Sequence, residues 1–108
     1  MDIELLREYV LKMPDVTEGF PFGESTLVFK TGGKVFLLVS LDAQPLQFNV
    51  KCNPEEAIEL REEFPDTVLP GYHMNKKHWN TVIVNGTLSG KQLKEMMDKS
   101  YRLVSKQK

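Results

Sequence analysis

The stretch from residue 26 to residue 51 constrains the fold most, because its apolar residues follow the two-residue period of β-strands. Residues 26–30 and 34–40 are rich in β-branched and aromatic side chains, and Gly32 and Gly33 between them are typical of a hairpin turn. Residues 46–51 alternate apolar and polar side chains, as in a strand with one buried and one solvent-exposed face. The stretch therefore predicts an antiparallel meander of three strands.

Helical patterns flank this meander. A first apolar stripe at helical spacing ends at Pro14. Asn53 and Pro54 are a strong helix start, and Ser89 with Gln92 forms a capping box. We expect the three helices at residues 2–13, 54–64 and 89–104.

Two short strands are predicted at residues 67–69 and 79–84, and the Pro- and Gly-rich connector 14–24 leaves room for an edge strand around Phe20 and Phe22. The order is then α-β-β-β-α-β-β-α. Runs of strands with helices between them predict a two-layer α+β fold, an antiparallel sheet with helices packed on it. The 108 residues fit one domain, residues 1–108.

Composition narrows the class of protein. The chain is 41% hydrophobic and 27% charged, as in ordinary globular proteins. Its longest apolar run is too short to span a membrane, and its start lacks the pattern of a signal peptide. The single cysteine, Cys52, excludes an internal disulfide. We therefore expect a cytoplasmic protein with no membrane association.

Charge is distributed unevenly along the chain. Residues 1–70 contain 6 Lys and Arg against 13 Asp and Glu, a net of −7, whereas residues 71–108 contain 8 against 2, a net of +6. A basic segment can attract polyanions even when the whole protein is near neutral. Alternatively, the two halves pack against each other or are simply solvated.

Residues 71–79, Gly-Tyr-His-Met-Asn-Lys-Lys-His-Trp, concentrate both histidines and the only tryptophan. His73 and His78 have no nearby acid or cysteine, so they make a poor zinc site, and we expect them to fix a turn. The sequence has no phosphate-binding glycine loop, nucleophile elbow or His-Glu-x-x-His motif. It therefore predicts no metal, no cofactor, no catalytic residue and no enzymatic activity.

The same segment, extended to residues 70–82, resembles the MmcQ/YjbR-like family, and the resemblance runs over nearly the whole chain. Supporting segments are residues 29–36, 51–55 and 100–104. The resemblance implies a two-layer α+β fold that has been likened to secretion chaperones, frataxin-like proteins and "double wing" DNA-binding domains. Family members are often labelled DNA-binding on that structural analogy, so the resemblance implies a DNA-binding module.

A DNA-binding module is the leading functional hypothesis. Lysines and arginines neutralise phosphates, and aromatic rings stack on exposed bases. The expected nucleic-acid-binding residues are Lys76, Lys77, His78, Lys91, Lys94 and Arg102. In the alternative interpretation of the motif, its turn is structural and is anchored by Tyr72, His73, Asn75 and Trp79.

The second hypothesis is a protein-interaction or self-associating module that does not bind nucleic acid. A large exposed apolar patch would favour it. A continuous basic face joining the motif to the last helix would favour DNA, whereas neutralisation of the basic segment by the acidic helix would favour the second hypothesis.

Overall fold

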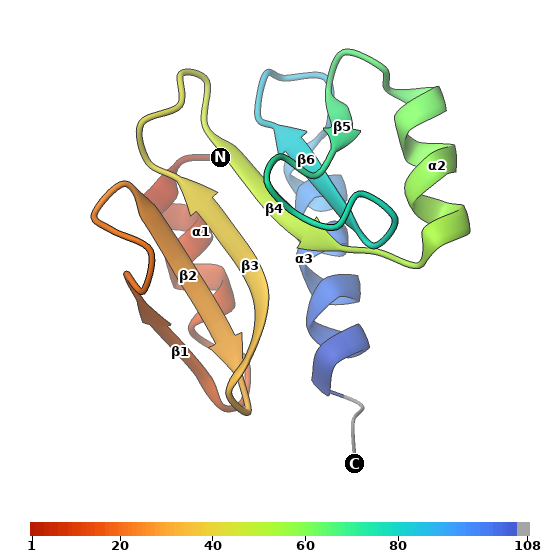
Figure 1. The fold of residues 1–108 in the computed structure, drawn as a ribbon. Helices are drawn as coiled ribbons and strands as arrows, with labels where there is room; N and C mark the ends of the chain where they lie inside the picture. Colours follow the sequence, from red (N-terminus) through yellow and green to blue (C-terminus); the bar gives the residue numbers. More distant parts are fainter. Residues whose placement is uncertain (106–108) are drawn as a thin grey trace.

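The computed structural model describes residues 1–105, which form three helices and six strands (Figure 1). In chain order the elements are α1 (Ile3–Val10), β1 (Val16–Gly19), β2 (Thr26–Thr31), β3 (Lys34–Ser40), β4 (Gln47–Lys51), α2 (Pro54–Glu63), β5 (Val68–Pro70), β6 (Trp79–Ile83) and α3 (Gly90–Ser105). The predicted α+β class and order are confirmed, with one further edge strand, β1, after α1.

This edge strand lies earlier in the connector than the sequence suggested. Phe20 and Phe22 follow β1 in an exposed turn, in which the backbone N–H of Gly23 donates to the Phe20 carbonyl oxygen at 3.3 Å. β1 follows Pro14, whose carbonyl oxygen accepts a hydrogen bond from the Tyr101 hydroxyl at 2.7 Å. This long-range bond fixes the chain just before the strand begins.

The six strands form one antiparallel sheet in the order β1-β2-β3-β4-β6-β5. Gly32 and Gly33 have positive φ angles of 57° and 81°, as the β2–β3 turn requires. The register shifts between Phe29 and Lys30, which leaves Phe36 as an extra residue in β3, a β-bulge.

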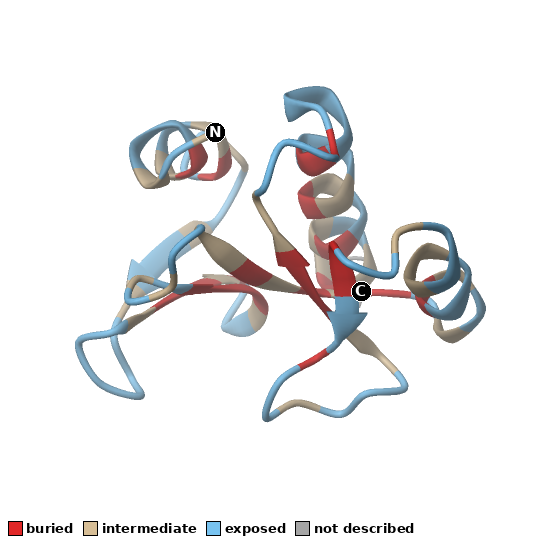
Figure 2. Cartoon of the chain, turned by 90° about the horizontal axis from the view of Figure 1, so that it is seen from above, coloured by how far each residue is buried: buried red, intermediate tan, exposed pale blue. Residues whose placement is uncertain are grey.

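Helices α1 and α3 lie against one face of the sheet, and α2 lies beside its β5 end (Figure 2). The buried core fills the space on the helix side. We call this the inner face and the opposite side the outer face. The strand register places these side chains on the outer face: Thr17, Thr26, Val28, Lys30, Val35, Leu38, Ser40, Gln47, Asn49, Lys51, Leu69, Trp79, Thr81 and Ile83.

The predicted helix starts are present. The Asn53 side chain accepts from the backbone N–H of Glu55 at 3.0 Å, and Ser89 and Gln92 exchange two hydrogen bonds as a capping box. Helix α1 ends at Val10, earlier than predicted, because a tight turn precedes Pro14. In the described residues, no helix combines the length and apolar character that crossing a bilayer requires.

Candidate nucleic-acid interface

The connection between β5 and β6, residues 71–78, crosses the outer face in front of the sheet (Figure 1). Its first residue, Gly71, donates its N–H to the Trp79 carbonyl oxygen at 2.9 Å. Inside the connection, the Asn75 carbonyl oxygen accepts from the N–H groups of His78 and Trp79, and its side chain accepts from Lys77 N at 2.9 Å. Asn75 therefore organises the turn through both its main chain and its side chain.

Helix α2 holds the connection through Arg61, whose polar contacts with the sheet the sequence did not predict. The Arg61 Nε donates to Asn80 Oδ1 at 2.7 Å, and its Nη2 donates to the carbonyl oxygens of Trp79 and Lys76. Asn80 is fully buried and donates in turn to the Ala57 carbonyl oxygen at 3.3 Å. In the sequence, the bond between Arg61 and Asn80 is indicated only by the polar Asn80 at an inner-face position of β6.

Tyr72 departs from the expectation of a buried anchor, because 71% of the residue is exposed. The attachment to the sheet uses its backbone: Tyr72 N donates to Thr81 Oγ1 at 3.0 Å, and that hydroxyl donates to Asn49 Oδ1 at 2.6 Å. The ring lies against the exposed His73 ring, with centroids 4.0 Å apart. Trp79 is half-buried on β6. The motif therefore presents the rings of Tyr72 and His73 to solvent.

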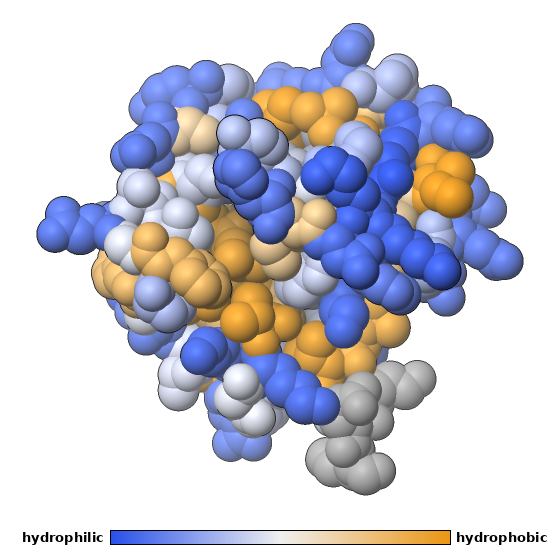
Figure 3. Space-filling view, viewed as in Figure 1, coloured by the Kyte–Doolittle hydropathy of each residue, from blue (hydrophilic) through white to orange (hydrophobic). Residues whose placement is uncertain are grey.

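A hollow of about 400 Å³ lies on the outer face, and we call it the outer hollow. Strand residues form its floor, and it is bordered by one residue of the loop after β1, Phe22, and by residues of the β5–β6 connection. Its lining consists of Phe22, Thr26, Leu38, Ser40, Gln47, Asn49, Tyr72, His73, Met74 and Thr81. Strongly hydrophilic side chains gather over the β5–β6 connection, and less hydrophilic surface lies over β2–β4 (Figure 3).

The cations of the motif lie on this side of the molecule. Lys77 is exposed, and Lys76 donates its ammonium to the Gly71 carbonyl oxygen at 3.2 Å. His78 is half-buried just before β6, and its carbonyl oxygen accepts from Cys52 N at 2.7 Å. Among the outer-face side chains of the six described strands, two are lysines and none is an acid. These lysines are Lys30 and Lys51.

The other predicted cations, Lys91, Lys94 and Arg102, are exposed on α3, behind the sheet (Figure 2). Lys94 Nζ lies 5.1 Å from the centroid of the Tyr9 ring. The Tyr9 hydroxyl donates to Asp98 at 2.7 Å, and burial together with this bond raises the pKa of Tyr9 to about 12. The sheet thus lies between the two predicted groups of cations. Lys106 and Lys108, from the same basic half, lie outside the described residues.

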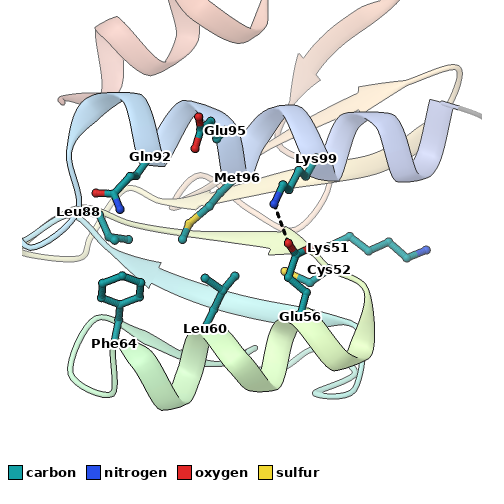
Figure 4. Close-up of a pocket in the computed structure, with 10 residues that line it drawn as sticks. All are labelled: Lys51, Cys52, Glu56, Leu60, Phe64, Leu88, Gln92, Glu95, Met96 and Lys99. Carbon is teal, nitrogen blue, oxygen red and sulfur yellow. Dashed lines mark hydrogen bonds and ion pairs between the residues drawn. The ribbon is translucent and has the colours of Figure 1, made fainter.

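A narrow groove of about 100 Å³ separates α2 from α3 (Figure 4). An ion pair crosses it, with Lys99 Nζ 2.6 Å from Glu56 Oε2. Cys52 borders the groove, and burial raises the pKa of its thiol to about 11. The thiol is therefore protonated near neutral pH and lacks the thiolate character of a reactive cysteine. Within residues 1–105, no three His, Cys, Asp or Glu side chains gather as a metal site would require.

The family model described as YjbR matches residues 11–103. The chain belongs to the YjbR family. This confirms the resemblance found in the motif. YbdF of Escherichia coli O157:H7 is 37% identical over 94% of this chain and 82% of its own length. YjbR of Escherichia coli K12 is 29% identical over 94% of this chain and 86% of its own.

Solved structures of two related proteins share the fold of this YjbR-family chain. Deinococcus radiodurans protein DR2400, described as a DUF419 domain, is 39% identical with a TM-score of 0.93, covering 97% of this chain and 79% of that one. A Pseudomonas syringae protein is 25% identical with a TM-score of 0.77, covering 95% and 98%.

Proposed function

We propose that this YjbR-family protein is a non-enzymatic module that binds DNA across the outer face of its sheet. The proposal rests on the distribution of charged side chains on the outer face. The outer-face side chains of the described strands include Lys30 and Lys51 and no Asp or Glu, and the β5–β6 connection adds Lys76 and Lys77 on the same side. Lysines near one surface bind phosphates and release counterions, which supplies most sequence-independent affinity.

Exposed aromatic residues favour single strands over duplex. Tyr72 and Phe22 are 71% and 68% exposed, and both border the outer hollow. Aromatic rings beside a basic surface stack on unpaired bases regardless of sequence. The arginine suited to bidentate base reading, Arg102, lies on α3 behind the sheet. We therefore expect the protein to bind DNA through contacts with its phosphate backbone and by stacking on its bases, with little preference for sequence.

Two matched double variants test which face binds. Lys76→Glu with Lys77→Glu and Lys91→Glu with Lys94→Glu change the net charge equally, but on opposite sides of the sheet. Fluorescence anisotropy with single- and double-stranded DNA at several salt concentrations would measure both. We expect the first variant to lose about tenfold or more in affinity for every sequence and to reduce the salt dependence, and the second to retain most binding.

Three outcomes would contradict the proposal. The first is no binding by the unmodified protein at low salt and roughly tens of micromolar, the range of non-specific affinities. The second is an equal loss in both variants, which would indicate only a general charge effect. The third is a loss confined to the α3 variant, which would place binding on the inner side.

The same exposed aromatics favour self-association as the second candidate function. Phe20, Phe22, Leu69 and Tyr72 are large exposed apolar residues of the outer-face strands and the loops next to them. If a second copy covers this face, light scattering will show a dimer, and Tyr72→Lys will dissociate it. A strict monomer at high concentration removes this candidate.

A further inference from the structure

We propose that the outer hollow is a pocket for a single unstacked nucleobase, an inference that rests on and deepens the proposed DNA binding. Its volume of about 400 Å³ lies within the range of small-molecule sites, about 300–1,000 Å³, and exceeds the volume of one base. Polar side chains line its floor and aromatic rings border it. This combination fits a flat heterocycle with hydrogen-bonding edges.

The two aromatic rings come from distant parts of the chain. Phe22 belongs to the loop after β1, and Tyr72 to the β5–β6 connection, yet both line one hollow. The position of Tyr72 is fixed by its backbone bond to Thr81 and by its ring contact with His73. Rings held exposed beside a concave polar surface supply the stacking contact that an unpaired base lacks in water.

The floor supplies hydrogen-bonding groups suited to a base edge. Asn49 Oδ1 already accepts from Thr81, so its amide NH₂ remains the donor of that side chain toward the hollow. Gln47, two residues away on the same face of β4, adds a carboxamide with both a donor and an acceptor. Every base displays adjacent donors and acceptors on its pairing edge, so this floor recognises a base without selecting one.

The distribution of charge orients the ligand. The lining contains no Lys, Arg, Asp or Glu, while Lys76 and Lys77 lie on the connection that borders the hollow. Phosphates are therefore held at the border, and the neutral base enters the hollow. A base in a single strand and a free nucleotide offer the same ring and the same phosphate. The experiment must therefore distinguish these two ligands.

Binding of oligothymidylate is compared with that of an abasic oligomer of equal length and charge. We expect the unmodified protein to bind the abasic oligomer about tenfold or more weakly, the change expected for loss of base stacking. Phe22→Ala should remove this difference and leave abasic binding unchanged. Phe20→Ala is the matched control, because Phe20 lies in the same turn and is 51% exposed but does not line the outer hollow. Gln47→Met, which keeps the shape of the side chain, should reduce the difference.

Equal binding of both oligomers, with the Lys76 and Lys77 dependence retained, would overturn the base pocket and leave DNA binding standing. If neither oligomer binds, DNA binding fails and thymidine monophosphate tests the hollow separately by NMR. Amide shifts at Gln47, Asn49 and Thr81 that disappear in Phe22→Ala would support a site for free nucleotides. Absence of such shifts would overturn the inference.

Discussion

Replacing Gly71 by alanine is expected to destabilise the fold at the start of the β5–β6 connection. Gly71 is buried, and a Cβ atom built on it would lie 2.8 Å from the Trp79 Cβ and 3.0 Å from the Trp79 carbonyl oxygen. Both neighbours are held in place, because Trp79 begins β6 and its carbonyl oxygen accepts from Gly71 N and Arg61. Neither atom belongs to a flexible side-chain end that could move aside.

The size of the effect follows from this short contact. Carbon atoms in favourable contact lie about 3.5–4.0 Å apart, so the added methyl group requires a displacement of roughly 1 Å. Such overpacking typically costs about 1–3 kcal/mol. For a domain of about this size, that corresponds to a fall in Tm of roughly 5–20 °C.

Thermal and urea unfolding followed by circular dichroism would measure the change. Gly19→Ala is the control, because no atom lies within 4 Å of the Cβ it adds, and the same chemical change should leave stability equal or raise it by about 0.4–1 kcal/mol. Equal stability of Gly71→Ala and Gly19→Ala would refute the reasoning. The Gly71 variant should also bind DNA more weakly, since the position of Lys76 and Lys77 depends on this turn.

Two further predictions concern buried polar groups. Ser100 is buried, and its Oγ donates to the Phe36 carbonyl oxygen at 2.5 Å and accepts from Lys51 N at 2.9 Å. Ser100→Ala should therefore lower the free energy of unfolding in urea by about 1–3 kcal/mol. A loss of stability no larger than that of Ser25→Ala, at an exposed serine, would contradict this prediction. The pKa of Cys52 is raised from its ordinary value near 9.0 to about 11, so the stability due to the buried neutral thiol is complete below pH 9 and is lost as pH rises toward 11 and above. The loss should reach about 2–3 kcal/mol, and Cys52→Ala should flatten the alkaline part of the stability curve; parallel curves for both proteins would argue against it.

Structural features that depend only on residues close together in the chain could be predicted from the sequence. Asn53 and the Ser89–Gln92 pair start their helices because capping involves residues within three positions of each other. The alternation along Gln47–Lys51 likewise indicates which side chains face away from the core. These signals fixed the fold class without any tertiary information.

Features that depend on tertiary contacts could not be predicted in this way. β1 is placed by its pairing with β2, and the Tyr101 hydroxyl that bonds to Pro14 lies 87 residues away in sequence, so local patterns put this strand too late in the chain. The bond from Arg61 to Asn80 likewise crosses from α2 to the sheet. The structural interpretation of the motif expected Tyr72 to anchor the turn, but the structure attaches its backbone and leaves the ring in solvent.

The basic half of the chain is continuous in sequence, but the fold divides it between the two sides of the sheet. β6 carries the chain from the outer side of the sheet to α3 on the inner side, so the motif and the last helix face opposite ways. Two α3 cations have partners there, with Lys99 paired to Glu56 and Lys94 placed over Tyr9. The outer face therefore offers four lysines in the described chain, Lys30, Lys51, Lys76 and Lys77.

This division has a measurable consequence for DNA binding. If the four lysines of the outer face each neutralise a phosphate, log K should fall against log salt with a slope of about −3 to −4. If instead all 8 cations of residues 71–108 took part, the slope would be about −6 to −7. A steep slope would mean that DNA contacts both sides of the sheet or that α3 is the true interface. A shallow slope that Lys76→Glu with Lys77→Glu reduces by about two would assign the contacts to the outer face, because only there do these two lysines supply half of the available charge.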